Sequence, residues 1–395
     1  YDAQHNLAHI VAPDETIRSR TYDALGRLVG LTDARGQVER RRYDRKGQLV
    51  ALLAADGQQT QLTYDGEGNV LRARQGEQEV SFAYTSVSRL AVRRQAGQEV
   101  RFAYDREGRL VELTNEHGRR YRFGLDAAGR VVEEEGFDGL LRRYERDAAG
   151  RVTTVHRPAE RRTSYTYDAV GHLATVAYNK EAPTSYRYDF DGGLLEATTA
   201  TTSVQLERDA LGRVVREQQG AHSVRYEYDV RGQRIGLQSS LGAAFAWQHD
   251  VLGNLTTVRA GAAWQAQLRH DERGLEVQRR LSGGLRLDWQ RDAAGRPTSQ
   301  RVAVGSQPTH QRRYQWQGDD QLTAIEDSYT GTTRYTYDAV GTLTGATYAE
   351  GSADVRLADA VGNLFRSPAL NDRQYAPGGQ LRQAGGTRYK YDAEG

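Results

Sequence analysis

The sequence predicts an all-β fold in which β-hairpins follow one another in a sheet that winds on itself into a curled, largely hollow shell. One reason is a pattern, Y-D-x-x-G-x-L, that returns along the whole chain, as in Tyr337 to Leu343. Another is the alternation of apolar and polar residues before each copy, which is typical of strands. The third is that only 38% of the residues are hydrophobic. A sandwich of two facing sheets would need more apolar residues than this.

Copies of the pattern, counted from the Tyr position, are mostly 20 or 21 residues apart. A period between about 20 and 50 residues indicates a repeat architecture and not one ordinary globular core. The second position is Asp and the fifth is Gly in 17 of the 20 copies each. We mark the repeats at residues 1, 22, 43, 64, 84, 104, 125, 146, 167, 188, 208, 228, 249, 270, 291, 316, 337, 358, 375 and 391. We therefore predict a single repeat domain over residues 1–395.

The Asp and the Gly of each copy predict a hairpin turn. An Asp side chain accepts backbone N–H bonds across a bend, and Gly adopts the positive φ that a short loop requires. The turn residues that we single out are Asp23, Gly26, Asp44, Gly47, Asp168, Gly171, Asp338 and Gly341.

Periodic Asp and Gly also mark repeats that bind calcium, but those repeats are about nine residues long and supply several oxygen ligands per turn. This chain has one such Asp per 20 or 21 residues. We therefore predict no metal site and no cofactor.

The Tyr of each copy and the residue two positions earlier predict an aromatic stripe on one face of the sheet, because a spacing of two puts both side chains on the same side of a strand. The stripe residues that we single out are Tyr165, Tyr167, Tyr186, Tyr188, Tyr226, Tyr228, Tyr335 and Tyr337. Cross-strand packing explains such pairs. Stacking of the rings on sugars is the alternative, and it defines a second function class.

Two histidines, His249 and His270, stand in the Tyr position of successive repeats, and an Asp follows each. We interpret them as flat aromatic substitutes within the stripe and not as metal ligands or catalytic bases.

A second turn, rich in Gly, Asp or Asn, falls midway through many repeats, as at residues 115–118 and 350–352. Each repeat is therefore expected to form two antiparallel strands, which gives about forty strands in series. An open twisted sheet of more than about ten strands must curl or close. The spacing becomes irregular within residues 291–391, where we expect a change of curvature or an end of the shell.

Composition and motifs exclude several classes of protein. The net charge is +2, from 54 basic and 52 acidic residues, which argues against a dedicated nucleic-acid binder. There is no Cys for a disulfide or a thiolate metal site. No apolar run approaches the length of a membrane span. The G-x-S-x-G, H-E-x-x-H and P-loop signatures are missing, so we predict that this segment is not an enzyme.

Runs such as Arg20 to Val29 and Tyr165 to Leu173 resemble the YD-repeat proteins, which include bacterial Rhs toxins, the B and C components of Tc toxins, and animal teneurins. The resemblance covers essentially the whole chain. Since the chain lacks Cys and 51 of its 54 cations are Arg, it is most similar to the Rhs branch of Gram-negative bacteria.

The resemblance implies a β-cocoon, a hollow spiral shell of hairpins that encloses a C-terminal toxic domain as cargo until the protein is secreted and delivered into a target cell, often by a type VI secretion system. Other shell and plug segments of the same polypeptide would be its partners, and secretion-spike proteins would be further ones. The self-cleavage motif of Rhs proteins, D-P-x-G-L, is missing, because none of the seven prolines follows an Asp. The chain starts and stops within repeats, so we expect a piece of a longer shell. The alternative function is a cell-surface adhesive or carbohydrate-binding protein.

Overall fold

The computed structural model describes residues 1–11, 17–33, 36–55, 57–317 and 320–394. Within these ranges the chain is almost entirely β-structure, with one short 3₁₀ turn, η1 (Pro377–Gly379). No helix in the described ranges is long and apolar enough to cross a membrane.

The strands of the first half of the chain are mostly five to seven residues long. They are β1 (His9–Val11), β2 (Ile17–Tyr22), β3 (Leu28–Thr32), β4 (Val38–Tyr43), β5 (Leu49–Leu53), β6 (Gln59–Tyr64), β7 (Val70–Gln75), β8 (Gln78–Tyr84), β9 (Leu90–Gln95), β10 (Gln98–Tyr104), β11 (Leu110–Thr114), β12 (Arg120–Leu125), β13 (Val131–Glu135), β14 (Leu141–Arg146), β15 (Val152–Arg157), β16 (Arg161–Tyr167), β17 (Leu173–Tyr178), β18 (Thr184–Tyr188) and β19 (Leu194–Thr198).

The second half continues in the same manner and then shortens. Its strands are β20 (Ser203–Arg208), β21 (Val214–Gln219), β22 (His222–Tyr228), β23 (Arg234–Ser239), β24 (Ala244–His249), β25 (Leu255–Ala260), β26 (Trp264–His270), β27 (Glu276–Leu281), β28 (Leu285–Arg291), β29 (Pro297–Val304), β30 (Gln307–Trp316), β31 (Leu322–Asp327), β32 (Gly331–Tyr337), β33 (Leu343–Thr347), β34 (Ala353–Val355), β35 (Leu357–Ala358), β36 (Leu364–Phe365), β37 (Arg373–Tyr375), β38 (Leu381–Ala384) and β39 (Thr387–Arg388).

The first 34 of these strands form one antiparallel sheet. Each strand pairs with the next one along the chain, from β1 with β2 to β33 with β34. The sheet is open, because its first and last strands pair only with their sequence neighbours. It ends at β34, after which β35 and β36 form one small sheet and β37 to β39 form another.

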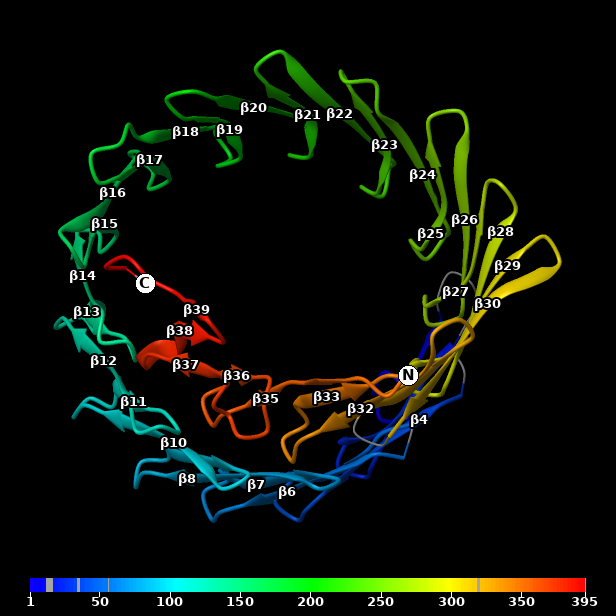
Figure 1. Cartoon of the computed structure of the whole chain (residues 1–395), viewed down its shortest axis with the longest axis horizontal. Helices are drawn as coiled ribbons and strands as arrows, with labels where there is room; N and C mark the ends of the chain where they lie inside the picture. Colours follow the sequence, from blue (N-terminus) through cyan, green and yellow to red (C-terminus); the bar gives the residue numbers. More distant parts are fainter. Residues whose placement is uncertain (12–16, 34–35, 56, 318–319, 395) are drawn as a thin grey trace.

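Seen down its shortest axis, the sheet bends into a ring, and no strand crosses the centre of the ring in this view (Figure 1). The bending has a local cause. In each motif hairpin of the long sheet, the residue at the Tyr position pairs with the seventh residue of the pattern and one residue is bulged out, as where Thr21 pairs with Gly30 and Tyr22 with Leu28. A bulge increases local twist and bends the strand, so its regular recurrence winds the sheet.

The wall is a single layer, and burial is correspondingly shallow. Among the described residues no large side chain is fully buried, and the buried hydrophobic residues are five alanines and Phe365. Side chains along a strand alternate between half-buried and exposed, as in β6 and β10. The sequence prediction of an all-β array of hairpins that curls into a spiral shell is confirmed.

The spiral makes more than one turn, so that late repeats lie against early ones. Arg273 faces Asp33 at 3.9 Å, His117 faces Asp359 at 3.7 Å, and Arg161 pairs with Asp392 at 2.7 Å. These partners are 240, 242 and 231 positions apart in the sequence, which corresponds to about twelve repeats per turn of the spiral. We call residues 17–250 the first coil and residues 271–394 the second coil. In Figure 1, β33 and β35 to β39 lie inside the part of the ring that β4 to β16 form.

Candidate functional site

The turn of each Y-D motif, which we call the YD turn, is closed by its Asp. In the turn that starts at Asp23, the carboxylate Oδ1 accepts the N–H groups of Leu25 and Arg27 at 3.0 Å each, and Gly26 has a φ of 75°. The Gly26 N–H donates to the Asp23 carbonyl at 3.0 Å. A positive φ of this size is the reason for Gly at that position, because a side chain would be strained there.

The other turn residues that the sequence singled out lie in the same geometry. Oδ1 of Asp44 accepts the N–H of Gln48, that of Asp168 accepts three N–H groups, and that of Asp338 accepts those of Val340 and Thr342. The φ angles of the matching glycines, Gly47, Gly171 and Gly341, are 85°, 101° and 87°.

Charge reinforces several of these turns. The residue after the Gly is often Arg, and its guanidinium pairs with the second carboxylate oxygen of the same Asp, as at Arg130 and Asp126, 2.8 Å apart. The backbone N–H and the guanidinium of Arg130 hold the pKa of the Asp126 carboxyl below its usual value. The arginine also reaches the next repeat: Nη1 of Arg27 donates to the carbonyl of Asp44 at 3.0 Å.

In most repeats that carry it, the motif Tyr links the repeat to the one before it. Its hydroxyl donates to the backbone carbonyl of the seventh residue of the preceding motif, for example from Tyr167 to Val152 and from Tyr337 to Leu322, at 2.8 Å each. Tyr228 does the same to Val214 at 2.8 Å. We call this contact the tyrosine staple. The sequence predicts packing for these rings, with stacking on sugars as the alternative, and does not predict the contact of the hydroxyl.

Arginine replaces Tyr in several copies and keeps the staple. Arg146, Arg208 and Arg291 donate to the carbonyls of Val131, Leu194 and Glu276, which are the equivalent acceptors. One signal in the sequence could have indicated the staple. Arginine, which replaces Tyr in these copies, is a long side chain with N–H donors. His249 and His270 are different, because the Nδ1 atom of each is buried without a hydrogen-bond partner among the described residues.

The stripe residues lie on one face of their strands. Tyr165, Tyr186, Tyr226 and Tyr335 stand two positions before a motif Tyr, and all four are half-buried, whereas the residues between each pair are exposed. Arginines cover some of the rings: the Arg151 guanidinium lies 4.7 Å from the ring centre of Tyr167, and that of Arg234 lies 4.3 Å from Tyr226. Tyr188 packs instead on the ring of His172, at 4.9 Å.

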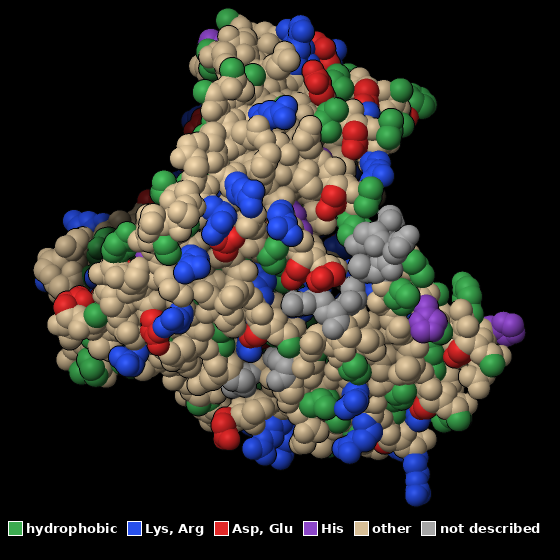
Figure 2. Space-filling model, turned by 90° about the vertical axis from the view of Figure 1, so that its right-hand side faces the viewer, with side chains coloured by type: hydrophobic (Ala, Val, Ile, Leu, Met, Phe, Trp, Pro, Cys, Tyr) green, Lys and Arg blue, Asp and Glu red, His purple; other side chains and the backbone are tan. Residues whose placement is uncertain are grey.

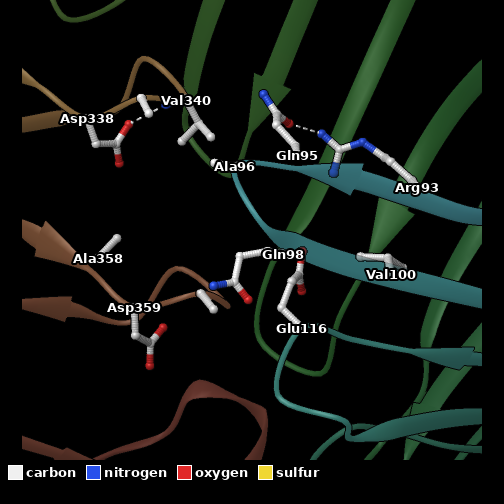
Figure 3. Close-up of a pocket in the computed structure, with 12 residues that line it drawn as sticks. Arg93, Gln95, Ala96, Gln98, Val100, Glu116, Asp338, Val340, Ala358 and Asp359 are labelled. Atoms are coloured by element: carbon white, nitrogen blue, oxygen red, sulfur yellow. Dashed lines mark hydrogen bonds between the residues drawn. The ribbon is translucent and has the colours of Figure 1, made fainter. Parts of the chain in front are cut away.

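A groove runs where the two coils meet, with a volume of about 320 Å³. Figure 3 shows Asp338 and Val340 of the β32–β33 turn on one side of it, and Ala96 and Gln98 of the β9–β10 turn on the other. Asp359, from the next YD turn, lies on the side of Val340. The groove is thus the joint between a YD turn of the second coil and the midway turns of the first. We call these midway turns the intervening turns.

The end of the described chain is held to the first coil by charge. Arg161 donates to Asp392 at 2.7 Å and to Glu394 at 3.0 Å, and Arg157 pairs with Glu394 at 2.9 Å. The Tyr178 hydroxyl donates to Glu394 at 2.8 Å. Hydrogen bonds from Tyr178 and Arg161 hold the pKa of Glu394 below its usual value. We call this cluster the tail latch.

Elsewhere the surface mixes both signs of charge. Figure 2 shows Lys and Arg interspersed with Asp and Glu on the face of the molecule that carries the N-terminal strands. Charged residues are also paired elsewhere on the molecule, as Glu133 with Arg143 at 2.7 Å. Within the described ranges no three His, Cys, Asp or Glu side chains are grouped closely enough to hold a metal ion.

Comparison with known proteins agrees with this architecture. The chain matches the family model described as Teneurin YD-shell over residues 1–133 and 142–288. No curated protein matches the chain significantly.

Solved structures share the fold. They include the Tc holotoxin pore of Photorhabdus luminescens, with 13% sequence identity and a TM-score of 0.64, where the match covers 88% of this chain and 21% of the other. The TcdB2-TccC3 complex is 14% identical, with a TM-score of 0.64 and a match over 91% of this chain and 22% of the other. TcdB2-TccC3 without its hypervariable C-terminal region is also 14% identical, with a TM-score of 0.65 over 93% and 22%.

The chain spans about a fifth of the length of these toxin structures. The family model, by contrast, matches more than half of the chain, and its repeats are the hairpins described above. The chain belongs to the Teneurin YD-shell family, and its structure is that of a shell of the Tc and Rhs type.

Proposed function

We propose that this chain is a wall segment of a toxin shell that encloses a C-terminal toxic domain and keeps it sequestered until delivery. The observation that supports this most directly is the single-layer wall that curves round a ring without a core of large buried side chains in its described part. Strand pairing, tyrosine staples and YD turns stabilise a wall of this kind. The face that points into the ring is then free to surround a cargo domain.

The segment is proposed to be a container and not an enzyme, with residues 1–395 as one repeat domain. Confinement is the mechanism: a cargo domain within the shell is kept from the cytoplasm and lacks the space to complete its fold. Its partners are then its own cargo and other shell or plug segments of the same polypeptide, with secretion-spike proteins as further candidates. No nucleic acid and no membrane contact is proposed for this segment.

The delivery route is part of the proposal. We place it in a Gram-negative bacterium that secretes the protein into a target cell, by a type VI secretion system. The support is compositional, since the chain has no Cys and its cations are almost all Arg.

Limited proteolysis of the full-length protein that carries this segment tests the enclosure. The C-terminal cargo is expected to be degraded far more slowly within the full-length protein than when it is expressed alone. Adding this 395-residue segment separately to the free cargo is the control, because it should give no protection. Equal degradation rates in all three samples would contradict enclosure. If glycan arrays then detected binding by the segment, the carbohydrate-binding alternative would be favoured.

A further inference from the structure

Five neighbouring strands, β25 to β29, each carry one arginine on the face of the sheet that lies opposite the aromatic stripe. The side chains of a strand alternate between its two faces, and cross-strand partners share a face. Val258 pairs with Trp247, which stands at a stripe position, so Arg259 beside it points to the opposite face. Strand pairing continues this face to β29. We call these residues the arginine face, and they are Arg259, Arg269, Arg280, Arg286 and Arg301.

The positive charge of the arginine face is largely unmatched. All its members except Arg286 are exposed, and those four make no ion pair with a described residue. Arg286 pairs with Asp288 at 2.8 Å, and Asp288 is the one acidic residue that the described strands β25 to β29 have on this face. Balanced groups lie elsewhere on the same face, as where Arg122 is 3.0 Å from Glu112 and 3.2 Å from Glu135. Figure 2 views the molecule from the side on which β26 to β30 lie, and several Lys and Arg side chains are close together near its centre.

Two members of the arginine face are placed so that they repel each other. Arg280 and Arg286 are direct cross-strand partners on β27 and β28. The Cβ atoms of such partners are about 5 Å apart, and like charges in this position destabilise the pair. Asp288 pairs with only one of the two guanidinium groups. An anion that binds both groups would remove the repulsion, so the arrangement indicates an anionic ligand.

The tail latch shows how this chain occupies such a pair. Arg157 and Arg161 are also direct cross-strand partners, on β15 and β16. Between them they bind two carboxylates that stand two positions apart in one segment. Arg157 lies 2.9 Å from Glu394, and Arg161 lies 2.7 Å from Asp392 and 3.0 Å from Glu394. An acidic stretch of polypeptide is therefore a ligand that opposed arginines of this sheet accept.

We propose that the arginine face is a docking surface for an acidic segment of another protein, in which Asp and Glu residues stand close together. A guanidinium group forms two parallel hydrogen bonds with a carboxylate. Five such groups on neighbouring strands span about 19 Å, because strands are about 4.8 Å apart. The surface thus offers several carboxylates a partner each. This docking is independent of whether the shell encloses a cargo.

The side chains between the arginines favour a polypeptide over a nucleic acid. Phosphates also suit guanidinium groups, but sites for single-stranded nucleic acid add aromatic side chains on which the bases stack. The described strands β25 to β29 have no aromatic residue on this face, because Trp264 and Trp289 lie on the stripe face. Glutamines fill much of the space instead, as Gln267 and Gln278 do, and their amides are further donors for carboxylates.

Fluorescence anisotropy tests the docking with a fluorescein-labelled peptide that repeats Asp-Ala-Glu-Gly, the order of residues 392–395. The 395-residue chain is expected to bind this peptide in a buffer of low salt, and not a peptide in which Gln replaces both acidic residues. Arg269→Gln with Arg280→Gln should weaken binding at least tenfold, because two charge-assisted contacts are lost. Added salt should weaken binding to the wild type as well.

Arg40→Gln with Arg42→Gln is the matched control. These arginines of β4 are also exposed and on the same face, but β3 and β5 have no arginine beside them. The control loses the same charge and should bind the peptide like the wild type.

Three results would each overturn the inference. They are no binding of the peptide to the wild type, equal weakening in the two double variants, and tighter binding of a thymidine oligonucleotide than of the peptide. If Arg269→Gln with Arg280→Gln loses the β-sheet circular dichroism spectrum, Arg269→Lys with Arg280→Lys takes its place. Lysine keeps the charge but lacks the planar fork of arginine, so binding should still weaken. Wild-type affinity in the lysine variant would contradict the proposed contacts.

Discussion

At the scale of the residue, the motif Tyr packs in the aromatic stripe and also donates a hydrogen bond. Its hydroxyl satisfies a backbone carbonyl next to the bulge of the preceding repeat, as Tyr337 does for Leu322 at 2.8 Å. Burial raises the pKa of Tyr337, so the hydroxyl keeps its proton and stays a donor across the physiological range.

Removing one staple hydroxyl is therefore expected to destabilise the wall locally. Tyr337→Phe should lower the free energy of unfolding by about 1 to 2 kcal/mol, because a hydrogen bond is lost and the Leu322 carbonyl loses its donor. Tyr335→Phe is the matched control, since the Tyr335 hydroxyl makes no hydrogen bond with a described residue. Urea unfolding followed by circular dichroism measures both. Equal losses in the two variants would show that the staple contributes nothing.

The sequence could predict the place of these rings but not this contact. A spacing of two residues fixes which face a Tyr occupies, whereas the carbonyl that it reaches lies 15 residues earlier and is presented by the bulge. Arg146 and Arg208 contain the clue, because a long N–H donor replaces Tyr there. A slot defined only by aromatic packing would not favour arginine.

At the scale of the element, the YD turn is held by a carboxylate that must be ionised to pair with the arginine. Backbone N–H groups and guanidinium groups lower the pKa of Asp105, Asp126 and Asp209. A carboxyl with a pKa lower in the folded than in the unfolded state, where it is about 3.9, stabilises the fold above that value. This stabilisation is lost as the pH falls from about 4 through the folded-state pKa.

Replacing these carboxylates with amides is expected to remove that pH dependence. Asn can still close the turn, since Oδ1 of Asn115 accepts the N–H groups of His117 and Arg119 at 3.1 and 2.9 Å. A variant with Asp105→Asn, Asp126→Asn and Asp209→Asn should lose at pH 7 the stabilisation that the ionised carboxylates supply, should approach the wild type near pH 2, and should show a flatter decline between pH 4 and 2. Urea midpoints measured across this range test it. Asp191→Asn, an exposed turn residue that closes no turn, is the control, and a slope unchanged in the triple variant would contradict the expectation.

The hairpins themselves were predictable from the sequence, because Asp, Gly and the alternation of apolar residues each act locally. The bulge in each motif hairpin of the long sheet was not, since register depends on the partner strand. The aromatic stripe could also be predicted from the sequence, because the spacing of two residues acts within one strand. The arginines that cover it, such as Arg151 over Tyr167, became apparent only when the strands were side by side.

At the scale of the whole molecule, the period predicts that the sheet must curl but does not say how many repeats complete a turn. The number of repeats per turn of the spiral depends on the small bend that each bulge adds. It can be read only from contacts between the coils, such as that of His117 with Asp359. Sequence analysis also expected irregularity within residues 291–391. In the structure the long sheet ends at Val355, and the following segments lie against the first coil.

The tail latch tests whether contact between coils, and not only strand pairing, holds the end of the spiral. The strands there are short, and β38 and β39 pair over two residues, so we expect their docking to depend on the ion pairs that Arg157 and Arg161 make with the segment after β39. Arg157→Ala with Arg161→Ala is expected to speed hydrogen exchange in β38 and β39 roughly three- to tenfold, because partly exposed ion pairs contribute about 1 kcal/mol or less each. Salt at about 1 M should have a similar effect on the wild type, since salt weakens partly exposed ion pairs. Arg162→Ala, an exposed neighbour, is the matched control. If hydrogen exchange in the double variant were as slow as in this control, the tail would be held by its own hairpin. The ion pairs between the coils would then contribute nothing to its docking.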